Sequence, residues 1–148
     1  MKAVENVVYK GKLLAVIIRA KALDELQASG KKMSFHTPEH FPLQVGIHSR
    51  QKGDAVSAHF HRHFPELKNL PVQEFFYVKS GKVKIDLFDE QEDDAKVSEV
   101  VAGSGDTVLL NTGHGMTFLE KTELIELKQG PYRGREEEKR FIGIEAKR

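Results

Sequence analysis

The most constraining feature of the sequence is an alternation of apolar and charged side chains that follows Gly81. Val83, Ile85 and Leu87 are each separated by one charged residue. Successive side chains of a β-strand point to opposite faces, so this pattern predicts a strand with one buried and one solvated face. A glycine permits the tight turn that would join this strand to the one before it, so residues 74–89 are predicted to form an antiparallel hairpin.

Short strands separated by turn residues are predicted along most of the chain. Apolar runs interrupted by Gly and Pro are typical of an all-β sandwich or barrel. Residues 20–29 are expected to form either a helix or a loop. At 148 residues the chain has the length of one domain with a substantial core. Further strands are predicted at residues 4–9 and 13–19, which would form an N-terminal hairpin, and at 43–49, 56–61, 96–101, 107–110, 116–119 and 124–128.

Four side chains of the chain could hold a metal ion. His59 and His61 lie in one predicted strand, so their side chains would project to the same side, about 7 Å apart along the strand. Glu74 begins the next predicted strand and could add a carboxylate, and His114 is available as a fourth ligand. Three nitrogens and one oxygen suit Fe, Mn, Ni or Zn better than Ca or Mg, which prefer oxygen ligands. The residues do not single out one of these metals.

The same residues resemble the cupin superfamily. In the first cupin motif, a glycine, a His-x-His pair, a glutamate and a second glycine follow one another at set intervals. Gly53, His59, His61, Glu74 and Gly81 stand in this order, with the intervals before His59 and after Glu74 as in the motif. The interval between the second histidine and the glutamate is longer, which predicts an inserted loop at 62–73 that borders the barrel opening and helps to select the substrate.

The second cupin motif is matched less fully. Gly105 opens it, and Asn111 stands where the motif has a proline before Gly113. The motif would place its histidine at Met116, and His114 matches only if the turn is two residues shorter. The resemblance as a whole covers about residues 43–130.

The resemblance implies an all-β fold, the antiparallel double-stranded β-helix of the cupin jelly-roll barrel, preceded here by the N-terminal hairpin. Residues 1–148 would form a single cupin domain with its motif-bearing core at about 43–130. One divalent transition metal (Fe, Mn, Ni or Zn) would bind at the barrel mouth. Its ligands would be His59, His61, Glu74 and His114.

Three functions are compatible with this set of residues. The first is a metal-dependent enzyme, of the isomerase or dioxygenase type, that acts on a small oxygenated molecule. The second is a metal-free sugar epimerase or ketoisomerase in which a cavity histidine is the general base; a carbohydrate substrate is a hint from the resemblance alone. The third is a non-catalytic sensor of a small ligand or a metal. Fold alone does not choose among them, and no catalytic residue is assigned.

Charge and composition limit the partners. The formal net charge is +1 and the basic residues are scattered, so nucleic acid is not an expected partner. The longest apolar run, residues 13–18, is too short to span a membrane, and the first residues lack the features of a signal peptide, so a cytoplasmic location is expected. The chain has no cysteine to serve as ligand or nucleophile. Exposed strand edges favour a homodimer, in which the N-terminal hairpin is a candidate for exchange.

Several polar residues are expected outside the metal site. In the predicted strand 124–128, Glu126 and Lys128 could face a substrate, but Ile125 and Leu127 are expected to face inward, which would leave the charged pair in solvent. The charges of residues 133–140 are expected to cover a solvated face or loop, and residues 141–144 to pair as an edge strand. His36, His40 and His48 are expected at the surface or behind the ligands, with His48 facing the cavity if residues 43–49 are a barrel strand. His63 continues the row of the histidine pair, but Pro65 is expected to end that strand.

Overall fold

The computed structural model describes residues 2–68 and 71–143 of the chain. Helix α1 (Lys21–Ala28) lies between the first two strands and the rest, and α2 (Arg135–Glu138) is a single short turn near the C-terminal end. No helix in this described part is long and apolar enough to cross a membrane. The strands are β1 (Val4–Tyr9), β2 (Lys12–Ile18), β3 (Met33–Phe35), β4 (Leu43–Arg50), β5 (Ala55–His61), β6 (Glu74–Ser80), β7 (Lys82–Asp89), β8 (Ala95–Gly103), β9 (Thr107–Leu110), β10 (Gly113–Phe118), β11 (Thr122–Gln129) and β12 (Lys139–Phe141).

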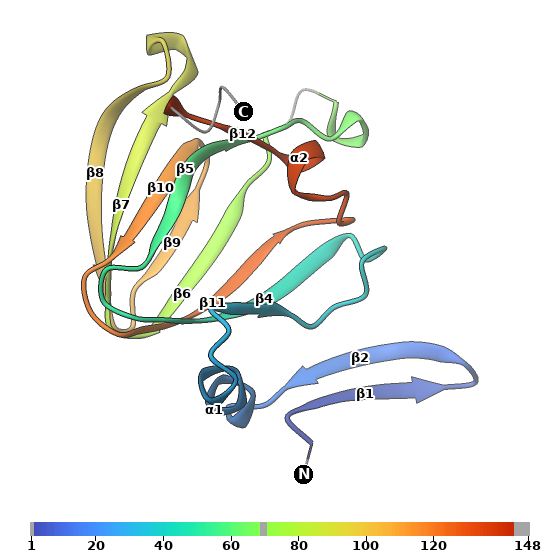
Figure 1. Ribbon diagram of the computed structural model, residues 1–148. Helices are drawn as coiled ribbons and strands as arrows, with labels where there is room; N and C mark the ends of the chain where they lie inside the picture. The colour runs from blue at the N-terminus through green and yellow to red at the C-terminus, as the bar shows by residue number, and fades with distance from the viewer. Residues whose placement is uncertain (1, 69–70, 144–148) are drawn as a thin grey trace.

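Two antiparallel sheets form the body of the molecule (Figure 1). Within the described residues, one has the strand order β12-β5-β10-β7-β8 and the other β3-β4-β11-β6-β9. Val83, Ile85 and Phe118 of the first sheet pack with Val78 and Leu124 of the second. The apolar core therefore lies between the two sheets, as the jelly-roll prediction requires.

The hairpin of β6 and β7 follows the predicted alternation. Glu74, Phe76 and Val78 are buried, whereas the residues between them are exposed. Gly81 makes the turn at a φ of +92°, a value that favours a residue without a side chain. Glu74 is the first residue of β6, at the end of the strand away from this turn, and it lies on the same buried face as Phe76 and Val78.

The N-terminal hairpin is present and projects from the body (Figure 1). Its base packs with α1, whose Leu23 and Leu26 cover Ile47 of β4 and the outer face of β11 at Ile125. The helix confirms one of the two alternatives for residues 20–29. Beyond this contact, an open apolar groove of about 560 Å³ separates β2 from the outer face of the second sheet; Leu14, Val16, Leu43 and Leu127 are among its lining residues.

The prediction for β11 was wrong. Glu126 and Lys128 face the barrel interior and are 5% and 7% exposed, while Ile125 packs outward against the α1 cluster. The interior accepts these charges because each is paired. Glu126 contacts His48 at 2.6 Å, and Lys128 donates to Glu138 at 3.1 Å.

The prediction for the C-terminal segment was also wrong in two respects. Glu138 is buried and Lys139 is half-buried, so residues 133–140 do not simply cover a solvated face. The edge strand pairs at Lys139–Phe141 with β5, earlier than predicted, because this segment crosses back over the barrel to reach the end of β5. Ile144 lies outside the described residues. Residues 33–35 also form a short strand, β3, where no strand was predicted.

Candidate metal centre

The four candidate ligands meet at one end of the barrel interior. One ligand atom from each of His59, His61, Glu74 and His114 lies within 4.8 Å of the other three. The Nε2 atoms of His61 and His114 lie 3.1 and 2.9 Å from Oε2 of Glu74, and those of His59 and His61 are 3.3 Å apart. Three strands supply these side chains. β5 and β10 pair with His59 opposite His114, and β6 brings Glu74 from the other sheet.

Backbone carbonyls determine which ring nitrogens face the centre of the cluster. Nδ1 of His59 donates to the carbonyl oxygen of Ser57 at 2.7 Å, and Nδ1 of His114 donates to that of Thr112 at 3.0 Å. A carbonyl oxygen can only accept, so both Nδ1 atoms carry the hydrogen. In the neutral rings, Nε2 of both histidines therefore presents a lone pair to the cluster. Such backbone contacts commonly orient histidine ligands of metals.

The resulting contacts suit a bound cation. The unprotonated Nε2 of a neutral His114 and the carboxylate of Glu74 are both acceptors, yet they lie 2.9 Å apart. A proton or a metal ion between them is needed to make this contact favourable. Burial raises the pKa of Glu74, but hydrogen bonds from His114 and His61 in their protonated forms outweigh it and keep the pKa well below its usual value. The donor set of three imidazoles and one carboxylate fits a divalent transition metal.

Burial of His59 predicts a strong loss of stability in acid. Burial, with smaller effects of Lys139, His114 and His61, lowers the pKa of His59 from 6.5 to about 2. The unfolded chain therefore binds a proton below about pH 6.5 that the folded, metal-free protein does not bind. We expect the free energy of unfolding to fall by roughly 1 kcal/mol per pH unit from this residue as the pH drops from 6.5 towards 2. Because folding also lowers the pKa of Glu74, this carboxylate further reduces the free energy of unfolding as the pH falls below the pKa of Glu74 in the unfolded chain.

Urea denaturation of the metal-free protein at a series of pH values measures this slope. His59→Gln removes the imidazole and should flatten the curve between pH 6.5 and 5, where carboxylates contribute little. His40→Gln, which changes an exposed histidine, should leave the slope unchanged. An equal slope in wild-type protein and His59→Gln would contradict this account.

A small cavity of about 50 Å³ adjoins the cluster inside the barrel. His59, Glu74 and His114 form one part of its wall. The remaining wall includes polar and charged side chains outside the four candidate ligands, among them His48, which was expected to face the cavity if residues 43–49 formed a barrel strand. These are His48, Arg50, Glu126, Lys128 and Lys139.

The buried pair of His48 and Glu126 forms part of this wall. Nε2 of His48 donates to the carboxylate of Glu126 at 2.6 Å, while the guanidinium of Arg50 contacts its Nδ1 at 3.3 Å. His48 is 3% exposed, so it faces the interior, as expected for a barrel strand at residues 43–49. His48 is therefore a titratable group inside the barrel that is separate from the metal candidates.

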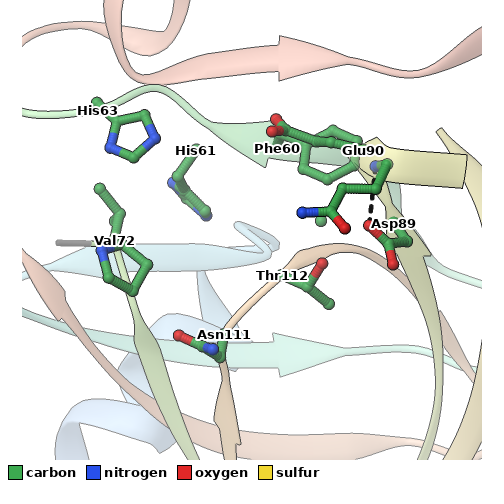
Figure 2. A pocket seen from close by; sticks show the side chains of 11 residues that line it. Phe60, His61, His63, Val72, Asp89, Glu90, Asn111 and Thr112 are labelled. Carbon is green, nitrogen blue, oxygen red and sulfur yellow. Dashed lines mark hydrogen bonds between the residues drawn. The ribbon is translucent and has the colours of Figure 1, made fainter. Parts of the chain in front are cut away.

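A second pocket, of about 180 Å³, reaches His61 from outside (Figure 2). His61 and His63 lie on one side of it near Val72, and Asp89 lies on the other. His63 is exposed and is not part of the four-residue cluster. The described parts of the inserted loop, residues 62–68 and 71–73, thus border this pocket.

Comparisons with known proteins support the fold. No family model and no curated protein matches the sequence. A variant of oxalate decarboxylase from Bacillus subtilis aligns with a TM-score of 0.56 at 18% identity over 74% of this chain, which spans 28% of that protein. KdgF from Halomonas sp. aligns with a TM-score of 0.50 at 19% identity, covering 68% of this chain and 78% of that one.

A cupin superfamily protein from Desulfitobacterium hafniense also aligns, with a TM-score of 0.50 at 10% identity, over 66% of this chain and 75% of that one. At these identities the similarity concerns the path of the backbone and not the chemistry of the site. The chain has the cupin fold, and the predicted jelly roll with its N-terminal hairpin is confirmed.

Proposed function

We propose that this cupin holds one divalent transition metal on His59, His61, Glu74 and His114 and acts on a small oxygenated molecule as a metal-dependent enzyme of the isomerase or dioxygenase type. The observation that carries the proposal is that the Nε2 lone pairs of His59 and His114 converge with the Glu74 carboxylate in a buried site. Nε2 of His114 lies 2.9 Å from Oε2 of Glu74, and Nε2 of His59 lies 3.3 Å from that of His61. When bound, the metal would polarise an oxygenated group, acidify a bound water or, if it is iron, supply redox chemistry.

Residues of the chain would supply the other functions of such a site. Strands from both sheets hold the ligands and exclude bulk water, since His59, Glu74 and His114 are each no more than 3% exposed. Nε2 of His48 holds a proton against Glu126 at 2.6 Å on the wall of the same cavity. This pair is our candidate for the group that gives a proton to a substrate or takes one from it.

The first test of the proposal is metal content. Protein purified without an affinity tag should contain about one metal per chain by inductively coupled plasma mass spectrometry, either as isolated or after incubation with iron, manganese, nickel or zinc. Oxygen consumption and isomerase screens would then separate the two reaction types. Absence of metal under all of these conditions would refute the metalloenzyme proposal.

One observation favours a second function, a metal-free sugar epimerase or ketoisomerase. The buried pair of His48 and Glu126 is a ready acid–base group that needs no metal. Activity that survives exhaustive chelation and is lost in His48→Gln would support this alternative. A protein that keeps its metal but turns over no oxygenated substrate would instead be a sensor.

We also propose that the chain is one domain and forms a homodimer in which the N-terminal hairpin covers the apolar groove of a second copy. Val8, Tyr9 and Leu14 of the hairpin are 58%, 60% and 56% exposed, and the groove beside them is open. Such exposed apolar side chains are typical of an interaction surface.

Light scattering on a sizing column tests this assembly. The mass should be twice the 16.7 kDa of one chain, and Leu14→Asp should shift it towards the monomer. Lys12→Asp, in the same strand but at an exposed polar position, is the matched control and should remain dimeric. A wild-type mass equal to one chain would refute the dimer.

A further inference from the structure

Lys139 lies where two cavities meet. It is the first residue of β12, opposite His61 in the register with β5. Its side chain lines both the inner cavity of about 50 Å³ beside the metal candidates and an outer cavity of about 470 Å³. Phe35 and Lys128 also line both cavities, so the two spaces share a wall. The Lys139 side chain therefore lies at the boundary between the outer cavity and the cavity beside the cluster.

The carboxylates around Lys139 each contact another side chain. Glu74 contacts His61 and His114, Glu126 contacts His48, and Oε2 of Glu138 accepts from Lys128 at 3.1 Å. The buried Oε1 of Glu138 has no hydrogen-bond partner among the described residues. In the described part of the chain, no ion pair involves the Lys139 ammonium, although these three carboxylates attract it from a greater distance.

The charge of the interior also favours an anion. Four cationic side chains and four carboxylates line the two cavities: Arg50, Lys128, Arg135 and Lys139, and Glu39, Glu74, Glu126 and Glu138. These eight charges balance, so a divalent metal would leave two positive charges in excess. Uncompensated charge in a buried site is costly, and an anionic ligand would offset it.

We infer that Lys139 binds a carboxylate group of the substrate in the inner cavity, while the remainder of the molecule occupies the outer cavity. The inference rests on the proposed metal site and narrows its substrate to small organic acids. The inner cavity has room for a group of a few atoms and not for a whole metabolite, whereas the outer cavity has aromatic walls at Phe35 and Tyr132 for a carbon skeleton. Lys139 is thus a substrate-binding residue in addition to the four candidate metal ligands.

Calorimetric titration of the manganese-loaded protein tests the inference. The probes are malonate and benzoate as carboxylates, malonamide as the neutral counterpart of malonate, and inorganic phosphate as another anion. We expect at least one carboxylate to bind and malonamide not to bind. Lys139→Met keeps the length of the side chain without its charge and should weaken carboxylate binding by about tenfold or more, because a partly buried charge-assisted contact is lost.

Two further variants complete the design. Lys139→Arg retains the charge and should retain most of the binding, and Lys52→Met removes an exposed lysine away from the cavities and should change nothing. Equal carboxylate affinity in wild-type protein and Lys139→Met would overturn the inference, as would binding of phosphate alone or of no probe.

Metal content measured on the same samples separates this inference from the proposed function. About one manganese per chain in both wild-type protein and Lys139→Met, with carboxylate binding weakened only in the variant, supports both. Full metal content without carboxylate binding overturns the anion site and leaves the metal site standing. Absence of metal from the wild-type protein overturns the metal site and, with it, the inference that rests on it.

Discussion

Glu74→Gln should reduce the affinity of the protein for its divalent metal by at least about 100-fold. Loss of a residue that only hydrogen-bonds to a metal ligand already lowers metal affinity by about 10- to 100-fold. The substitution keeps the shape of the side chain and removes the one carboxylate that contacts both His61 and His114. His59→Ala, which removes a nitrogen whose lone pair is directed at the cluster, should have an effect of similar size. Metal titration monitored by calorimetry, with mass-spectrometric metal content, measures both.

His63→Ala is the matched control for these variants. His63 continues the row of His59 and His61 but is exposed and lies outside the cluster, so its loss should leave the metal affinity unchanged. Circular dichroism would show that all three variants are folded. Retention of one metal per chain with wild-type affinity in folded Glu74→Gln would refute the proposed ligand set.

Gly81→Ala should destabilise the fold by about 3 kcal/mol or more, beyond the usual strain of about 1–3 kcal/mol for an unfavourable backbone conformation. The residue has a φ of +92°, and a Cβ atom there would lie 2.3 Å from the carbonyl oxygen of Lys121 and 2.5 Å from Oγ1 of Thr122. The backbone of the β6–β7 turn would have to move, and with it the hydrogen bond from Lys82 to Thr122. Urea denaturation followed by circular dichroism measures the change in the free energy of unfolding.

Gly105→Ala separates backbone strain from the steric clash. Gly105 has a similar φ of +89°, but apart from its chain neighbours no atom in the described part of the chain lies within 4 Å of the position of its Cβ. The control should therefore lose only about 1–2 kcal/mol, the cost of a left-handed conformation. Equal losses in the two variants would show that the close approach of Gly81 to residues 121–122 contributes nothing to the requirement for glycine.

The local patterns of the chain predicted most of the barrel. The alternation after Gly81, the pairing of short apolar runs and the turn glycines depend only on the two-residue period of a strand, which is visible in a single segment. The same period placed His59 and His61 on one side of β5, and the structure brings both to Glu74 and His114. Metal binding by these four residues remains a prediction.

The faces of β11 and the path of the C-terminal segment could not be predicted in this way. Glu126 and Lys128 are inside because partners from β4 and α2 pair with their charges, whereas Ile125 is outside because α1 covers that face. The contacts of Glu126 with His48 and of Ile125 with α1 join parts of the chain far apart in sequence, and Lys128 is paired across a turn of the chain that follows β11. Alternating side chains indicate that the two faces of a strand differ, but they do not indicate which face the rest of the molecule will cover.

By itself, the sequence determined most of the strands, their turns and the row of candidate ligands, because these depend on the geometry of neighbouring residues. Only the tertiary structure decided that charged side chains line the cavity beside the ligands and that, among the described residues, no carboxylate forms an ion pair with Lys139 there. The physical reason is that burying a charge is costly unless partners from other elements compensate it, as His48 does for Glu126 and Glu138 does for Lys128, and the closed barrel brings these partners together.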